Sequence, residues 1–505
     1  MKTDKLFVLI KSLQKSEKIF FKKNAGLYRK EGASNYLKLF DAIDKQVDYD
    51  EKKLLSKFKG SSVAKYFSVS KNYLYESILK SLRTFRQGKS LKDKVQALQE
   101  EATILIEKGL NKEALSMIKK AKKIAYSIDY FTGILELIVL ERSLTGTIVK
   151  LSAAINQKIS KEREAILARL QRQHEVSTAY HEISFMNRNY QFLRSGEDLM
   201  KIKTLIQQPL FETIDNMPSF HSKLHYYYAW AIYYQLTSNH ELEWENKRQL
   251  MLLWDAYPQM KGELERKYTT SLTIYASSCH LNDKTDELWN TIQVIEQFES
   301  QNNIIAVKMF FQLITCYCYY FDDSLDLEKW KAAIPKFEAE LDRYNDPRFI
   351  LIKRAAYLNI LRIYIILGEY ESAQNYSLLL NQLPKSEVHQ DAQYLAQLFS
   401  LVVYFKLEQE EQIQSLCRSI EYKINKDDNA YQYEHLLLKF FRKLAQTPKY
   451  EQGDCHKAYL EKFEALKAIE YEQDAFNRYF NIILWIKAEL RNTSMFVLRK
   501  EQQQH

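Results

Sequence analysis

The chain has 505 residues, more than one hydrophobic core usually organises, so several domains or a repeated architecture are expected. Hydrophobic residues make up 46% and charged residues 27%, a composition that argues against long disordered regions. The net charge is +9, and only 11 glycines and 7 prolines are present, a scarcity that favours helices joined by short polar turns over sheets.

Residues 1–90 form a basic head. The first 94 residues carry 23 Lys and Arg against 10 Asp and Glu, whereas the remaining residues carry 50 against 54. Apolar spacing in the head predicts five helical segments, over 4–13, 16–30, 34–47, 50–58 and 61–85. The apolar run Leu6 to Ile10 is too short for the core of a signal peptide.

The last of these segments, "SSVAKYFSVSKNYLYESILKSLRTF", resembles a bacterial helix-turn-helix. Five residues fall at the positions that lock such helices together, with Ser68 in place of the turn glycine: Ala64, Phe67, Val69, Leu74 and Ile78. The resemblance implies a second helix that enters the major groove of DNA. The residues it would bring to DNA are Lys65, Ser70, Lys71, Asn72, Tyr75, Lys80, Arg83 and Arg86. The alternative is a capping unit that closes the end of a repeat stack, with a basic surface that is simply solvated. The residues leave both open.

From residue 91 to 490 the helical pattern is interrupted at regular intervals. In the second half, polar turn pairs occur about every 40–45 residues, near 238–239, 282–283, 322–323, 368–369, 408–409 and 448–449. Each interval holds two predicted helices, which is typical of a solenoid of helical hairpins. Residues 150–195 fit either one long helix or a broken pair. Residues 491–505 are expected to form a frayed tail.

Two intervals resemble the tetratricopeptide repeat. "EKGLNKEALSMIKKAKKIA" (107–125) and "LGEYESAQNYSLLL" (367–380) share a turn glycine, Gly109 and Gly368, followed by small residues in the second helix. The resemblance predicts an all-α solenoid, with a longer period than the consensus of 34 residues. It also implies a concave face that binds a peptide or protein through Asn359 and Arg362, with Leu358 and Ile365 as apolar walls.

Catalytic and metal-binding patterns are not found in the sequence. There is no phosphate-binding loop or nucleophile elbow, and His174 and His181 are seven residues apart, which excludes a zinc-protease motif. Five scattered cysteines indicate a reducing compartment. The sequence contains no run of 18 apolar residues, so no membrane span is predicted.

The expected function is therefore that of a non-enzymatic cytoplasmic scaffold without cofactor or metal, which binds a peptide or protein and no membrane. The alternative is a transcription regulator that binds DNA through its head and uses the solenoid as a sensor or dimerisation module. The oligomeric state stays open.

Overall fold

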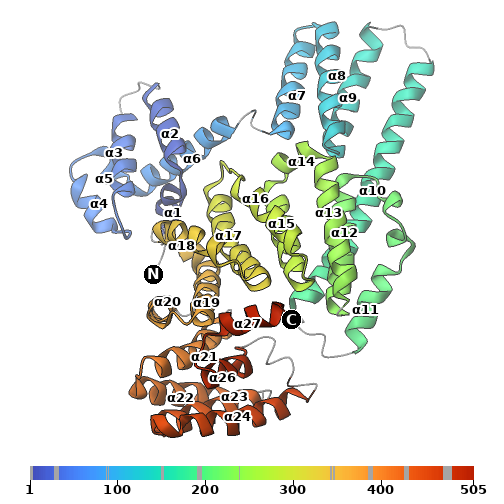
Figure 1. Ribbon diagram of the computed structural model, residues 1–505. Coiled ribbons are helices and arrows are strands. Elements are labelled where there is room, and N and C mark those ends of the chain that lie inside the picture. Colours follow the sequence, from blue (N-terminus) through green and yellow to red (C-terminus); the bar gives the residue numbers. More distant parts are fainter. Residues whose placement is uncertain are drawn as a thin grey trace. The chain divides into compact units, whose positions relative to one another are not determined.

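The computed structural model describes residues 4–27, 33–86, 88, 90–148, 153–189, 196–237, 239–341, 344, 347–384, 390–425, 432–469, 472 and 480–504. Within these residues every regular element is a helix, which confirms the all-α prediction (Figure 1). The chain divides into two compact units. Unit 1 comprises Met1–Asn239 and Arg248–Tyr268, and unit 2 comprises His240–Lys247 and Thr269–His505.

The head lies at the start of unit 1. Its helices are α1 (Lys5–Ser12), α2 (Lys15–Leu27), α3 (Ala33–Asp44), α4 (Glu51–Lys57), α5 (Ser62–Lys65) and α6 (Phe67–Arg86). These helices enclose a core of their own, in which Leu6, Ile10, Phe40, Leu74 and Ile78 are almost completely buried. The first four helices expected from the sequence are confirmed. The segment over 61–85 forms a four-residue helix, α5, and the long helix α6.

The rest of unit 1 is also helical. They are α7 (Leu91–Glu107), α8 (Asn111–Ser127), α9 (Phe131–Ile148), α10 (Ala153–Asn189), α11 (Gly196–Ile206), η1 (Pro209–Phe211), η2 (Ile214–Asn216), α12 (Phe220–Leu236) and α14 (Pro258–Glu263). Between α7 and α8, Gly109 adopts a φ of +73°, as a helix-ending glycine does. The region left open by the sequence, 150–195, contains one long helix, α10.

Two helices cross the division between the units, α13 (His240–Ala256) and α15 (Glu265–Leu281). The remaining helices of unit 2 are α16 (Thr285–Glu296), α17 (Asn303–Ser324), α18 (Leu327–Leu341), η3 (Pro347–Phe349), α19 (Ile350–Leu367), α20 (Tyr370–Gln382), α21 (Gln390–Lys406), α22 (Glu410–Ile424), α23 (Gln432–Gln446), η4 (Lys449–Glu451), α24 (Gln452–Lys467), α26 (Ile482–Leu490) and α27 (Met495–Gln504). From α16 to α24, nearly all sequence neighbours pack together, and the alternate helices α17, α19, α21 and α23 also contact one another in turn. This is the packing of a helical-repeat stack.

Left-handed backbone conformations mark the turns of this stack. Asp283, Gly368 and Glu408 have φ values of +54°, +80° and +56°, which confirms three of the expected turns. The turn expected at 322–323 is wrong, because these aspartates lie inside α17 and the chain turns at Leu325, with φ +50°. Leu325 is buried, so burial of its apolar side chain offsets the strain of a left-handed leucine.

Helix α17 is long and apolar enough to span a membrane by composition. In the structure, 56% of its most apolar window is buried inside the protein, as expected for a core helix. Its buried residues include Phe311, Ile314 and Phe321.

The residues beyond 479 form an ordered C-terminal segment (480–504) that turns back along unit 2. In α26, Trp485 is fully buried, with ring centroids 5.9 Å from Phe405 of α21 and 5.7 Å from Phe441 of α23. Helix α27 follows and contacts α19 and α26. The expectation of a frayed tail after residue 490 is therefore wrong, because residues 495–504 form helix α27, in which Met495 and Leu498 are buried.

Candidate protein-binding surfaces

The helix-turn-helix expected in the head is not formed as the sequence suggested. Ser68 lies inside the continuous 20-residue helix α6 rather than in a turn. The break falls earlier, at Tyr66 (φ −123°, ψ 48°), after the four-residue helix α5, whose first turn is capped by Ser61. No glycine at position 68 provides a tight turn, so the helix continues through it. Phe67 and Leu74 are buried, but as part of the head's core.

The residues proposed for DNA contact lie in different environments. Ser70 is buried, and Tyr75 is half-buried with the ammonium of Lys5 4.8 Å from its ring centroid. Asn72 is exposed and accepts a hydrogen bond from Lys5 at 3.1 Å. The exposed cations are Lys65, Lys80, Arg83 and Arg86.

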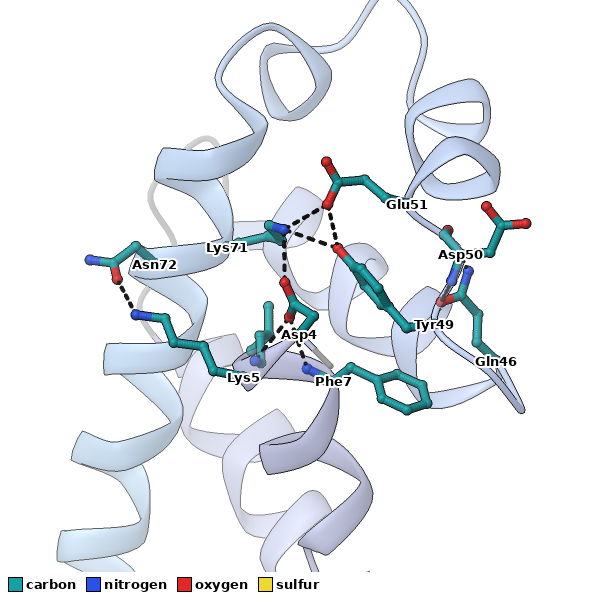
Figure 2. A network of polar contacts seen from close by, with 10 residues as sticks. Asp4, Lys5, Phe7, Gln46, Tyr49, Asp50, Glu51, Lys71 and Asn72 are labelled. Carbon is teal, nitrogen blue, oxygen red and sulfur yellow. Dashed lines mark hydrogen bonds and ion pairs between the residues drawn. The ribbon is translucent and has the colours of Figure 1, made fainter. Parts of the chain in front are cut away.

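Lys71 is bound within the head itself. Figure 2 shows its Nζ among Asp4, Tyr49 and Glu51, donating at 2.8 Å to Asp4, 3.0 Å to the Tyr49 hydroxyl and 2.8 Å to Glu51. Asp4 also caps α1, accepting from the backbone N–H groups of Leu6 and Phe7. Lys71 of α6 therefore binds residues at the start of α1 and at the start of α4. The carboxylates of Asp4 and Glu51 balance its positive charge.

Burial and charge shift the ionisation of this group, the Lys71 network. Burial raises the pKa of Tyr49 to about 12, against the opposing effect of its hydrogen bond from Lys71. Burial also acts to raise the pKa of Asp4, but Lys71 and the backbone donors outweigh it and lower that pKa. The hydrogen bond from Lys71 lowers the pKa of Glu51. All three shifts fit a network that stabilises the head with Lys71 charged and Tyr49 neutral.

In unit 2, the four residues predicted to line a peptide groove lie on one side of α19 at helical spacing, but they differ in exposure. Leu358, Asn359 and Arg362 are partly exposed and belong to one stripe at helical spacing, which begins at the exposed Leu351. Ile365 is completely buried in the core, so it does not line this stripe.

Arg362 stands where this stripe meets the C-terminal segment. Its guanidinium is paired with the carboxylate of Asp322, near the end of α17. Arg499 of α27 reaches the same aspartate, donating to the carboxylate at 3.1 Å and to the backbone carbonyl at 2.6 Å. The Asp322 side chain is only 5% exposed, so two guanidinium groups balance one almost buried carboxylate.

A second polar group adjoins it at the end of α17. Asp323 is 2.6 Å from Nδ1 of His280 on α15, and the His280 ring stacks on Tyr319 with centroids 4.5 Å apart. Burial raises the pKa of Asp323, with His280 opposing the shift. The backbone carbonyl of Asp323 accepts a hydrogen bond from Gln503 of α27 at 3.0 Å. The two aspartates and the end of α17 thus form an acidic site, the α17 acidic end, occupied by α27.

Sequence reasoning missed the residues that build this site. The aspartates of "FDDSLD" read as a solvated turn, and the partners of Asp322 are 40 and 177 residues away along the chain. A helical pattern that continues through Tyr319, Tyr320 and Phe321 into Leu325 was the available signal that the aspartates sit inside a helix.

Unit 1 contains a half-buried aromatic stripe on α12. Its members are Tyr226, Tyr227, Trp230, Tyr233 and Tyr234. Trp230 stacks on Tyr234 with centroids 5.4 Å apart, so much of this stripe is packed against itself. Next to it, burial lowers the pKa of His225 to about 3, which keeps this histidine neutral.

Among the described residues, no group of three or more His, Cys, Asp or Glu side chains is arranged to hold a metal ion. Cys316 and Cys318 are buried thiols, and burial raises the pKa of Cys316 to about 12.

Comparison with known proteins gives no relative: no protein-family model, no curated protein and no solved structure matches this chain.

Proposed function

We propose that the protein is a cytoplasmic interaction scaffold that acts by binding, and that the hairpin stack of unit 2 receives a peptide or protein segment on the face formed by α17 and α19. The observation that carries this proposal is that the stack already holds a helix from a distant part of the chain. Helix α27 is bound through an Arg–Asp pair and backbone carbonyl contacts at the end of α17. These are contacts of the kind by which helical-repeat surfaces bind peptides.

The rest of the same stripe on α19 provides further contact surface. Leu351 is 42% exposed, and Leu358 and Asn359 are partly exposed. Leucine side chains give apolar contact, and the Asn359 amide both donates and accepts hydrogen bonds, which suits the backbone of an extended segment. Protein interfaces combine apolar contacts with a smaller number of hydrogen bonds, and this strip offers both.

Affinity capture with single-residue variants tests the proposal. The full chain carrying Asn359→Arg introduces a long cation into the stripe and is expected to lose a partner that the unchanged chain retains. Tyr450→Ala is the matched control, because Tyr450 is a strongly exposed aromatic residue (85%) on η4, outside the stripe. A partner retained equally by both variants would show that binding does not use this face.

The second candidate function, nucleic-acid binding by the head, is favoured by a different observation. Helix α4 and the turn after it expose four lysines, Lys52, Lys53, Lys57 and Lys59. Such a cluster could neutralise phosphates without a helix-turn-helix. A variant that combines Lys52→Ala, Lys53→Ala and Lys57→Ala would then bind duplex more weakly. The slope of its log affinity against log salt concentration would be shallower by the amount expected for about three lost phosphate contacts. Absence of duplex binding at low salt would eliminate this candidate.

A further inference from the structure

Helix α27 is attached much more lightly than the helix before it. Five of the nine residues of α26 are buried: Ile482, Ile483, Trp485, Ile486 and Ala488. In α27 only Met495 and Leu498 are buried, and most of its other described side chains face solvent. A ten-residue helix is marginal in water by itself, so α27 stays helical because of the contacts it makes.

Those contacts are directed at the α17 acidic end. Arg499 and Gln503 donate to the backbone carbonyls of Asp322 and Asp323, at 2.6 and 3.0 Å. Carbonyls in the last turn of a helix have no partner within the helix and carry the negative end of its dipole. Together with the Asp322 carboxylate they make a site that selects a cation. Phe496 adds an aromatic contact, with its ring stacked 5.9 Å from that of Phe321.

The three contacting residues define a simple pattern. Phe496, Arg499 and Gln503 stand at positions i, i+3 and i+7, which share one face of a helix. One oxygen of Asp323 has no hydrogen-bond partner among the described residues although it is buried. A helix that supplied a donor there would satisfy an acceptor that α27 leaves unpaired.

We propose that α27 is a displaceable internal ligand, and that the α17 acidic end is a docking site for an amphipathic helix of another protein that presents an aromatic residue, an arginine three residues later and a hydrogen-bond donor at the seventh. This inference rests on the proposed binding function and specifies the partner. Because α27 is tethered beside the site, its effective concentration is high, and it lowers the apparent affinity for any helix that arrives from solution.

A fluorescein-labelled peptide with the sequence of residues 493–505 serves as the probe, and fluorescence anisotropy measures its binding to the full chain. Arg499→Ala in the protein frees the site without altering it, so the peptide is expected to bind this variant at least tenfold more tightly than the unchanged protein. Gln502→Ala is the control, since Gln502 is at an exposed position of the same helix and is not one of the three contacting residues. It should behave like the unchanged protein.

Two further measurements test whether the peptide binds at the α17 acidic end. Asp322→Asn, added to the Arg499→Ala variant, should abolish the gain in affinity, and so should replacing the arginine of the peptide by alanine. Equal binding of the peptide to the unchanged and Arg499→Ala proteins would overturn the proposal. Peptide binding that is unchanged both by Asp322→Asn and by replacement of the peptide's arginine would also overturn the proposal.

Hydrogen exchange on the unchanged protein tests, without any variant, whether α27 detaches more readily than α26. Amides of α27 should exchange at least tenfold faster than those of α26, and exchange as slow as in α26 would show that α27 is a fixed part of the core. None of these experiments needs a cellular partner. If the peptide does not bind, but capture of a partner depends on Asn359, the proposal that α27 is displaceable is rejected and the proposed scaffold function is retained.

Discussion

Replacement of Lys71 by methionine should loosen the N-terminal helix of the head. Methionine keeps most of the side-chain volume but leaves Asp4 and Glu51 without their shared cation. The Lys71–Asp4 pair is mostly buried, with side chains 18% and 15% exposed, whereas Glu51 is 48% exposed. Breaking a fully buried pair costs about 3–5 kcal/mol, and an exposed pair contributes about 0–1 kcal/mol. The intermediate burial here predicts a loss of about 2 kcal/mol.

Hydrogen exchange of the α1 amides measures this loss where it occurs, because Asp4 both binds Lys71 and caps α1. A loss of about 2 kcal/mol corresponds to exchange about 30-fold faster. Lys53→Met is the control, since Lys53 is an exposed lysine of α4 outside the network. Its effect should stay within about 0.5 kcal/mol. Equal effects of the two substitutions would refute the role assigned to Lys71.

The same network predicts how the difference depends on pH. The pKa values of Asp4 and Glu51 are lowered in the folded protein from ordinary values of 3.8 and 4.5. A carboxyl group with a lowered folded pKa contributes stability that is present above its ordinary pKa and is lost as the pH falls through the folded value. The effect of Lys71→Met should therefore be complete at pH 7, should begin to shrink below pH 4.5 through Glu51 and should shrink further below pH 3.8 through Asp4. A difference that stays constant down to pH 2 would contradict this reasoning.

The predicted effects of four other substitutions are measured by unfolding in urea. Trp485→Ala should cost about 3–5 kcal/mol, because it empties a fully buried site among the helices of unit 2. Lys122→Met should cost about 3 kcal/mol, since Lys122 is 8% exposed and bridges Glu141 and Glu162 at 2.5 and 2.8 Å. Gly109→Ala should cost about 1 kcal/mol and Glu408→Gly should gain about 0.5 kcal/mol, because both positions have positive φ. Equal signs for the last two would show that backbone strain does not govern these turns.

The sequence predicted the parts of the fold that local chemistry decides. Gly109 and Gly368 both end a helix with positive φ, and the apolar periodicity gave the helices of the head and the spacing of the stack. It failed where tertiary packing overrides local preference. Leu325 takes a left-handed conformation that leucine disfavours, because its side chain is buried.

The candidate site shows the same division. Arg362 was predicted from its register relative to Gly368, and it does lie partly exposed on the stripe of α19. Its partner Asp322 and the second guanidinium of Arg499 come from residues 40 and 137 positions away from it, and no local pattern relates such positions. Lys71 was assigned to DNA in the alternative interpretation, from the resemblance of its segment to a helix-turn-helix. The network that binds it instead brings together the ends of three helices, which only the folded head places side by side.

Photo-crosslinking tests the central claim most directly, since it reports which face a partner occupies. A photoreactive amino acid is placed at position 359 of the full chain, and in a second protein at position 450 on η4. A bound partner is expected to be covalently captured from position 359 and not from position 450. Capture from position 450 alone, or a partner that is retained but never cross-linked from position 359, would contradict the claim that the α17–α19 face is the binding surface.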